Sequence, residues 1–397
     1  MTTQHTLEIS APEGDDELRA FRAIGDYAFN ENPSPAPDIA RLQRQGIENL
    51  RVARVGGVVA AGLGMLPMGQ WFGGTSVPMV GINAVSTAPE HRSTGIMSRM
   101  LRQMLEEIHA DGSPLSALYP TTQPVYRRAG YEQAGIALDY KHPLHALSTG
   151  DRGLQVRRAG DEDTNTIQAL YAERARRTTG NLDRSEFMWA RVLEPREAPL
   201  NKYLVERDGT SEGYVIYTQR QPPGTKEKDI NCYDLVALTA DAARRLVAFF
   251  ADHRSTAEHL VWTGAPAEPL LLHVPNQAYK IDWYEQWMLR IVDVPAALAA
   301  RGYPTGVEAE LHLEVRDDVL APNNGRWVLA VSDGRAEVRE GGTGSIALDV
   351  RGLAPMYTGY LSPLELRAGG YVQGPEADLA LAGTVFAGPT PWMADGF

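Results

Sequence analysis

Three things are scarce in this chain, and each scarcity excludes a class of protein. Cys232 is the single cysteine among 397 residues, so the chain can form neither an intrachain disulfide nor a cysteine-based zinc cluster. No apolar run approaches the ~20 residues that a membrane-spanning helix needs. The opening residues, Met1 to His5, lack the basic segment and apolar core of a signal peptide. We therefore expect a cytoplasmic protein with no bound metal and no membrane partner.

Basic residues are also outnumbered. The sequence has 38 Lys and Arg against 50 Asp and Glu, a formal net charge of −12. Nucleic-acid binding depends on basic contacts to phosphates, so we expect no nucleic-acid partner. An acidic surface can attract a cationic substrate, although acidity also serves solubility alone.

The most informative stretch is the turn from His91 to Met97. An apolar strand, 80–85, precedes it, and apolar residues recur at three- and four-residue spacing over the helix 97–108 that follows. The free backbone N–H groups and the dipole at this helix start favour an anion. Gly95 permits close approach to the backbone, and Arg92 can add a charge-assisted contact. The turn is therefore a candidate pyrophosphate site.

Other phosphate-binding motifs are absent. The sequence contains neither a Gly-x-x-x-x-Gly-Lys-Ser/Thr loop nor the Rossmann glycine triplet. A strand, turn and helix with one glycine also occur where nothing binds, so the turn alone decides nothing.

A second apolar strand, 115–120, follows the helix and leads into the segment 121–131. Pro124 suits a first helical turn, and Gly130 suits the left-handed residue that closes a short helix. Tyr126, the basic pair that follows it and Tyr131 complete this segment.

These motifs resemble the acetyl-CoA loop and the following tyrosine segment of the GNAT acetyltransferases. More narrowly, they are similar to the Eis (enhanced intracellular survival) family. The features shared with that family are Ala84-Val85-Ser86, His91-Arg92, Gly95-Ile96, Tyr126-x-Arg128-x-Gly130-Tyr131, Trp287-x-x-Arg290-Ile291-Val292-Asp293-Val294 and a terminal phenylalanine. The resemblance spans essentially the whole chain.

A partial repeat supports a division into domains. The strand 155–158, the hairpin 203–217 and the strand 234–238 repeat the plan of the first part of the chain. At the second copy of the loop, Asp241 stands where a diphosphate would sit, and its carboxylate would repel a second anion. This copy is therefore expected to bind no CoA and to serve as scaffold and pocket wall.

Alternating apolar and polar residues then predict a sheet with one wet face, followed by short helices. The expected fold class is α+β, with two tandem GNAT-type domains and a sterol-carrier-protein-like α/β domain. The expected domains are 1–145, which binds acetyl-CoA, 146–290, without cofactor, and 291–397. A lipid function does not follow from that last likeness.

The resemblance implies acetyl-CoA as cosubstrate and a set of residues that hold it. The expected cofactor-binding residues are Val85, Ser86, Thr87, Arg92, Ser93, Thr94, Gly95, Ile96, Met97, Ser98, Thr121 and Thr122. No metal ligand is expected.

Acetyl transfer needs a proton for the departing thiolate. The resemblance points to Tyr126 as that acid, and the backbone N–H of Val85 as a donor to the developing oxyanion. Tyrosine titrates near pKa ~10, above a thiol at ~8.5, so proton transfer in the transition state is plausible. Tyr119 and Tyr131 are rivals in the same segment, and Tyr126 could instead be a packed core aromatic.

In Eis proteins the C-terminal carboxylate lies in the active site, which here assigns the base to Phe397. A terminal carboxylate of pKa ~3.5 is a weak base, so the site must lower the pKa of the amine, raise its own or relay through water. The prolines and aromatics of the tail oppose fraying, although a disordered tail is the alternative. Resemblance also makes Asp26 a substrate-binding residue, unless it lies on a solvated helix face. Asp395 would add negative charge, while Gly396 stands where some relatives have an acid.

The expected function is N-acetylation of a primary amine in a ternary complex, with no covalent enzyme intermediate. The resemblance suggests aminoglycosides, other polyamines or lysine side chains as acceptors, and a homohexamer. The alternatives are a CoA- or small-molecule-binding protein without transferase turnover, and a scaffold with a vestigial pocket.

Overall fold

The computed structural model describes residues 7–30, 39–148, 150–194, 199–225 and 227–397. Its first module holds the candidate anion-binding turn. The elements of this module are β1 (Leu7–Ser10), α1 (Gly14–Ala28), α2 (Ala40–Gln45), β2 (Leu50–Val55), β3 (Val58–Phe72), β4 (Thr75–Thr87), α3 (Ile96–Ala110), β5 (Leu115–Leu118), α4 (Gln123–Arg128) and β6 (Glu132–Pro143).

The second module has a related plan. Its elements are β7 (Gln155–Arg158), α5 (Thr164–Arg176), β8 (Leu182–Asp183), α6 (Glu186–Leu193), β9 (Asn201–Arg207), β10 (Thr210–Arg220), β11 (Asp229–Ala237), α7 (Ala240–Ala251), β12 (His259–Gly264) and β13 (Lys280–Ile291). In both modules a strand leads into an amphipathic helix: β4 into α3, and β11 into α7.

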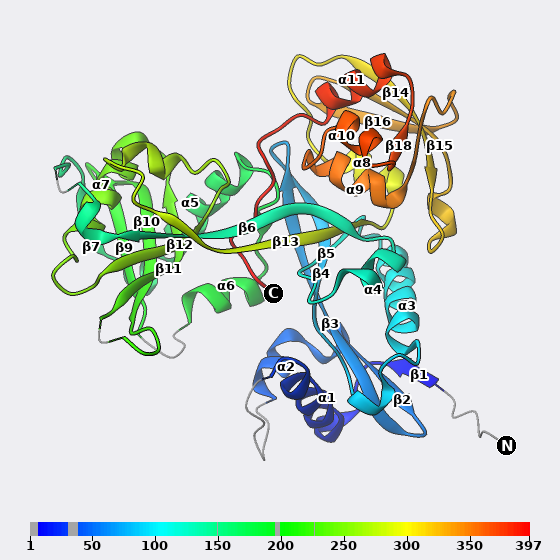
Figure 1. Ribbon diagram of the computed structural model, residues 1–397, viewed down its shortest axis with the longest axis horizontal. Helices are drawn as coiled ribbons and strands as arrows, with labels where there is room; N and C mark the ends of the chain where they lie inside the picture. The colour runs from blue at the N-terminus through cyan, green and yellow to red at the C-terminus, as the bar shows by residue number, and fades with distance from the viewer. Residues whose placement is uncertain (1–6, 31–38, 149, 195–198, 226) are drawn as a thin grey trace.

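Two long strands join the modules into a single 13-stranded sheet. The order is β1-β2-β3-β4-β5-β13-β6-β12-β11-β10-β9-β7, with β8 on β3. β6 pairs along most of its length with β13 and, toward its end, with β12 of the second module. β13 runs back and pairs with β5 through Met288 to Ile291. Figure 1 shows β6 and β13 side by side as the bridge between the two modules.

The third module is the α+β unit expected from the alternating pattern. Its elements are α8 (Val294–Ala300), β14 (Ala309–Arg316), β15 (Gly325–Ser332), β16 (Arg335–Glu340), β17 (Ile346–Asp349), α9 (Val350–Thr358), α10 (Pro363–Ala368), β18 (Val372–Gln373) and α11 (Glu376–Val385). The sheet order is β16-β15-β14-β17-β18, and α9 packs on β6 and β13 of the larger sheet. The expected fold class is confirmed: two GNAT-type units precede a sterol-carrier-type unit.

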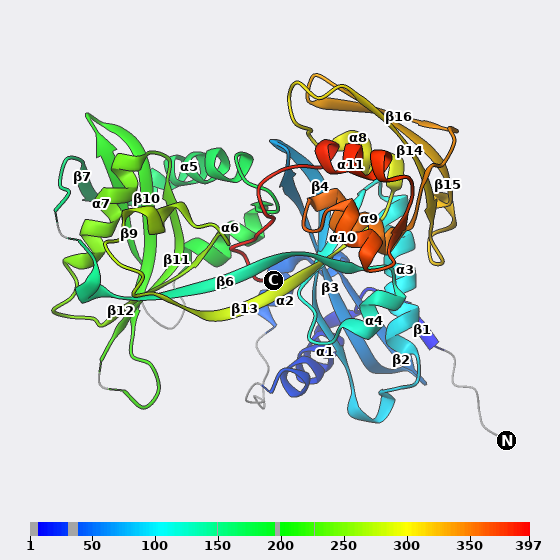
Figure 2. The same ribbon diagram turned by 45° about the horizontal axis from the view of Figure 1, so that its top comes forward.

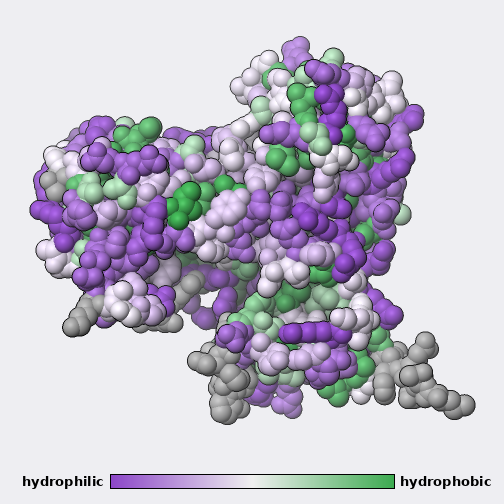
Figure 3. Space-filling view, in the orientation of Figure 1, coloured by the Kyte–Doolittle hydropathy of each residue, from purple (hydrophilic) through white to green (hydrophobic). Residues whose placement is uncertain are grey.

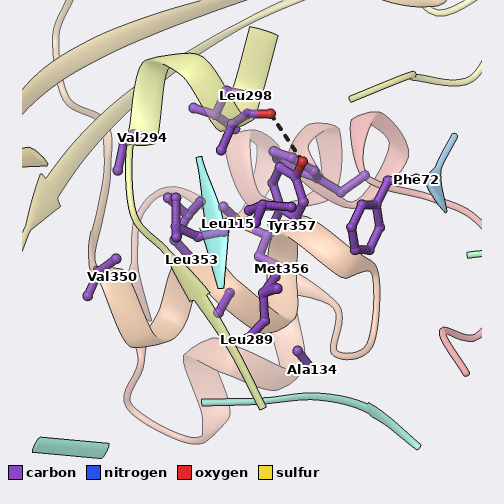
Figure 4. Packing of buried hydrophobic residues seen from close by; sticks show 14 of the residues in the cluster. Phe72, Leu115, Ala134, Leu289, Val294, Leu298, Val350, Leu353, Met356 and Tyr357 are labelled. Atoms are coloured by element: carbon purple, nitrogen blue, oxygen red, sulfur yellow. Dashed lines mark hydrogen bonds between the residues drawn. The ribbon is translucent and has the colours of Figure 1, made fainter. Parts of the chain in front are cut away.

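The largest hydrophobic core joins the third module to the first. Phe72 and Leu115 from the first module lie in one buried cluster with Leu289, Leu353 and Tyr357 (Figure 4). The rings of Phe72 and Tyr357 meet edge to face, with centroids 5.2 Å apart. Continuous apolar burial of this kind fixes the third module against the transferase sheet. Among the described residues, no helix is both long and apolar enough to cross a membrane.

Candidate active site

The turn before α3 has the geometry of an open anion cradle. Ser93 and Gly95 adopt positive φ angles of 63° and 84°, and Gly95 is the N-cap of α3. No side chain caps the helix, so its first N–H groups are free of side-chain acceptors. A Cβ at Gly95 would meet nothing within 4 Å, and the segment from Arg92 to Gly95 is exposed. The turn is therefore accessible to a phosphate group.

Next to this turn, β4 separates from its parallel neighbour β5. Their pairing ends at Gly81 and Ala117, whereas β4 continues to Thr87. A register shift opposite Leu63 places Ala84, with φ 52°, and Val85 in a β-bulge. Beyond Gly81, the backbone of β4 pairs only with β3 in the described part of the chain. The N–H and C=O groups on its other side are thus available to an extended ligand such as the amide-bearing arm of acetyl-CoA.

The residues expected to bind acetyl-CoA lie along this opening. Val85, Ser86 and Thr87 end β4, Ile96, Met97 and Ser98 form the first turn of α3, and Thr121 and Thr122 precede α4 and are exposed. The residues therefore fit a thioester donor with a pyrophosphate at the helix start. These assignments remain predictions, since the structure tests position and not binding.

The equivalent helix start of the second module is closed. Thr239 caps α7 by accepting a hydrogen bond from Ala242 N at 3.1 Å. Asp241 lies in the first turn and pairs with Arg207 and Arg244. Its carboxylate holds the favourable position near the helix dipole, while the absence of CoA from this module stays a prediction.

A cavity of about 760 Å³ lies between the two transferase modules. Its walls come from β6, β10, β11, β12, β13, α6, Tyr119 and the last four residues of the chain. Figure 3 shows the surface hollowed where the two modules part. A volume of this size suits a small-molecule acceptor.

The cavity is lined by carboxyl groups. Burial raises the pKa of Asp139, against a 2.6 Å hydrogen bond donated by Thr263 Oγ1, and burial raises the pKa of Glu285. Burial, and then the neighbouring carboxylates led by Asp395, hold the pKa of the Tyr119 hydroxyl well above its usual value. Two arginines, Arg191 and Arg220, line the same cavity, so a guest there would face both carboxyl and guanidinium groups.

The C-terminal tail reaches this cavity as an ordered segment. Trp392 forms a parallel bridge to Ile136 on β6 and donates from its backbone to Thr179 O at 3.0 Å. Met393 N then donates to Ile136 O at 3.1 Å. Figures 1 and 2 show the tail crossing from the third module to end between the two transferase modules. The structure therefore has an ordered tail, and the alternative of a disordered tail is wrong.

Phe397 ends at the point where β4 and β5 separate. Its ring meets that of Tyr119 edge to face, with centroids 5.8 Å apart. A Cβ on Gly81 would come 2.8 Å from Phe397 Cε2, so only glycine leaves room for this ring. The chain terminus therefore lies between this cavity and the opening in β4.

The three tyrosines of the β5–α4 segment are placed differently. Tyr126 is buried on α4, in the same apolar cluster as Val85 and Met97. Burial raises its pKa to about 12. Tyr131 is fully buried and shares a 2.7 Å hydrogen bond with Ser116 Oγ. Of the three, only Tyr119 lines the 760 Å³ cavity.

The two expected substrate carboxylates are both buried and paired. Asp26, on α1, forms a 2.8 Å ion pair with Arg22, and it does not line the 760 Å³ cavity. Asp395 lines that cavity, but its carboxylate accepts hydrogen bonds from Arg184 and Tyr171. The structure thus brings Phe397 and Asp395 together and leaves Asp26 apart.

Comparisons with known proteins agree with this geometry. Acetyltransferase (GNAT) domain models match residues 11–134 and 180–291, and a sterol carrier protein domain model matches 294–394. An uncharacterized N-acetyltransferase of Streptomyces avermitilis is 31% identical over 347 residues, 82% of this chain and 83% of that protein. The N-acetyltransferase Eis of Mycobacterium tuberculosis is 29% identical over 280 residues, 66% of this chain and 65% of that protein. This chain belongs to the Eis family of GNAT N-acetyltransferases.

Solved structures support the same family over the full length. The GCN5-related N-acetyltransferase of Anabaena variabilis superposes with a TM-score of 0.94 at 37% identity, covering 99% of this chain and all of that one. Eis1 of Mycobacterium abscessus shares the fold, with a TM-score of 0.81 at 24% identity over 98% of this chain and all of that one. The Eis-family chain is accordingly an N-acetyltransferase.

Sequence reasoning missed the acidic lining of this Eis-family cavity. Asp139 and Glu285 lie on β6 and β13, which are far apart in the chain and adjacent in the sheet. Neither residue belongs to a recognisable motif, so no local signal marked them. Arg184, which holds Asp395, was missed for the same reason.

Proposed function

We propose that this N-acetyltransferase moves the acetyl group of acetyl-CoA directly to a primary amine of a small cationic molecule, such as an aminoglycoside or another polyamine. The observation that carries the proposal is the position of Phe397, which lies in the carboxyl-lined cavity and against Gly81, where β4 and β5 separate. Donor and acceptor sites would meet there. A cavity of about 760 Å³ suits a small molecule.

In this mechanism each proton has a destination. Acetyl-CoA supplies the thioester carbon, to which the neutral amine forms its new bond. Phe397 accepts a proton from the amine through its carboxylate, Val85 N–H stabilises the oxyanion, and Tyr126 gives its proton to the departing thiolate. Family resemblance and chain position support the role of Tyr126, and contact with Phe397 supports Tyr119 as the second candidate acid.

The basic test is thiol release from acetyl-CoA with a panel of polyamines, aminoglycosides and lysine peptides. Turnover with a small polyamine supports the proposal. Binding of CoA without turnover on any amine would favour a binding protein, and preference for the peptides would favour a protein lysine acetyltransferase.

Phenylalanine substitutions should show which of Tyr126 and Tyr119 is the acid. Tyr126→Phe is expected to lower kcat by about 100-fold, the lower range for a single acid–base group, with little change in the KM for acetyl-CoA. Tyr119→Phe keeps the ring that contacts Phe397 and serves as the matched variant, with an expected loss below tenfold. If the two losses are exchanged, Tyr119 is the acid.

Ionisation of Tyr126 should cause no fall in kcat/KM at alkaline pH. Tyr126 acts in its protonated form, and with a pKa of about 12 it stays protonated throughout the usual assay range. The kcat/KM for the amine should therefore rise from pH 7 toward the pKa of the amine and then stay level to pH 10. A fall between pH 8 and 10 would contradict this assignment.

Changing Gly95 should weaken donor binding alone. Gly95 and Gly112 flank α3 with φ angles of 84° and 79°, and a Cβ at either meets nothing within 4 Å. Gly95→Ala and Gly112→Ala thus impose similar backbone strain. We expect Gly95→Ala to raise the KM for acetyl-CoA about tenfold, the effect of ~1.4 kcal/mol, and Gly112→Ala to leave it unchanged. Equal effects on KM would place the donor elsewhere.

We also propose that the protein is a cytoplasmic homohexamer, as family resemblance suggests. Ile281, Trp283 and Tyr284 of β13 are 56%, 44% and 52% exposed, which is apolar surface that a neighbouring copy would cover. Sedimentation equilibrium should give six times the mass of 43.4 kDa.

A further inference from the structure

The last four residues of the chain need a separate explanation for their order. Within the described residues, the last backbone hydrogen bond of the tail runs from Met393 N to Ile136 O. For residues 394–397, the contacts in the described part of the chain come from side chains: Ala394 packs against the apolar cluster around Ile136, Asp395 accepts hydrogen bonds, and the ring of Phe397 meets Tyr119. The position of the terminal carboxylate therefore depends on these side chains, and Asp395 is the one that is hydrogen-bonded.

Asp395 inserts into a socket built by the second module. Arg184 Nε donates to Asp395 Oδ1 at 2.9 Å, and the Tyr171 hydroxyl donates to Oδ2 at 3.2 Å. The side chains of Arg184 and Asp395 are only 1% and 4% exposed. Tyr171 lies on α5, and Arg184 follows β8. A buried, charge-assisted pair of this kind fixes the orientation of the Asp395 side chain.

The socket itself is held rigidly. Arg184 Nη1 also pairs with Asp234 on β11 at 2.5 Å, and its guanidinium lies 3.7 Å from the centre of the Tyr171 ring. Asp234 accepts a 2.6 Å hydrogen bond from Tyr214 and faces Arg174 at 3.8 Å. Two cations and two carboxylates, counting Asp395, thus balance in a nearly water-free cluster.

Distance then limits where the terminus can lie. Phe397 is two residues beyond Asp395, and an extended chain spans at most ~3.6 Å per residue, so the two Cα atoms are within about 7 Å. Fixing Asp395 therefore confines the terminal carboxylate to the wall of the acceptor cavity, where Phe397 meets Tyr119 and Gly81.

We infer that Asp395 is a positioning residue for the C-terminal carboxylate, and that the second module contributes to catalysis by holding it through Arg184. The carboxylate of Asp395 then contacts protein and not the amine. This inference rests on the proposed function, because it assumes that the terminal carboxylate takes the proton.

The test is a double-mutant cycle between Asp395→Asn and one alanine added after Phe397. If Asp395 acts through the terminal carboxylate, Asp395→Asn lowers kcat about 10- to 100-fold and leaves the KM for acetyl-CoA unchanged. In the extended enzyme the same substitution should lower the residual kcat less than twofold. Asp317→Asn, which breaks a buried ion pair away from the tail, is the matched control. It should lower thermal stability without changing kcat.

A second readout does not depend on turnover. Carboxypeptidase A should release Phe397 at least tenfold faster from Asp395→Asn than from the unsubstituted protein, with Asp317→Asn unchanged. If Asp395→Asn proves unstable, Tyr171→Phe removes the hydrogen bond to Asp395 together with the 2.9 Å hydrogen bond to Leu182 O, and it should show the same pattern at three- to tenfold.

Two results would overturn the inference. One is an unchanged kcat and release rate in Asp395→Asn. The other is a kcat loss of the same factor with and without the added alanine, which would mean a general structural role. If the unsubstituted enzyme acetylates no amine, the proposed function fails, and the carboxypeptidase rates still decide whether Arg184 and Asp395 hold the tail.

Discussion

Adding one alanine after Phe397 is expected to lower kcat at least 100-fold while the protein stays folded. The extension moves the charged terminus away from the cavity wall, because the ring of Phe397 is confined by Tyr119 and Gly81. Loss of a general base typically costs 10²- to 10⁴-fold in rate. Steady-state kinetics with saturating acetyl-CoA measure the effect, and the melting temperature reports folding.

The control is an extension at the other end of the chain. An alanine added before Met1 changes length equally and should leave kcat unchanged. An enzyme extended after Phe397 that works at the normal rate would contradict the role of the carboxylate, and Glu285, whose pKa is raised by burial, would be the next base to test.

Breaking the ion pair between Arg290 and Asp317 is expected to have the largest effect on stability. Both side chains are 0% exposed, and Arg290 Nη2 donates to the two oxygens of Asp317 at 2.8 and 2.6 Å. Asn323 and the backbone of Leu320 also donate to this carboxylate. Asp317→Ala leaves a buried guanidinium without its partner, which typically costs about 3–5 kcal/mol.

Chemical denaturation measures this loss. Arg326→Ala is the matched control, because Arg326 forms an exposed ion pair with Glu314 in the same module, and such pairs are worth about 0–1 kcal/mol. A similar loss in both variants would show that burial of the Arg290 pair does not decide its strength. Gly130 lies close against this ion pair, since a Cβ there would come 2.8 Å from the guanidinium carbon of Arg290.

Much of the local structure followed from short-range patterns. The hairpin expected over 203–217 is formed by β9 and β10, and the apolar spacing after Gly95 predicted α3. Gly130, expected to be left-handed, has a φ of 88°. These features depend on neighbours within a few residues, which is why the sequence alone specifies them.

The arrangement of strands did not follow from the sequence in this way. β13 of the second module lies between β5 and β6 of the first, so the sheet runs through the expected boundary at residue 145. The domain limits 1–145, 146–290 and 291–397 stay a prediction about the chain. The first two of these domains share one sheet. α11 was also missed, because its apolar residues surround the helix and give no amphipathic signal.

The sequence by itself determined the family, the glycine turn at Gly95 and the absence of such a turn before Asp241, because backbone conformation and helix-end charge are local properties. Only the tertiary structure decided that the chain terminus meets the end of the β4–β5 pairing, that Asp139 and Glu285 line one cavity, and that Arg184 holds Asp395. Arg184 and Asp395 are 211 residues apart in the chain. Such contacts arise from the packing of whole modules, which no spacing of residues records.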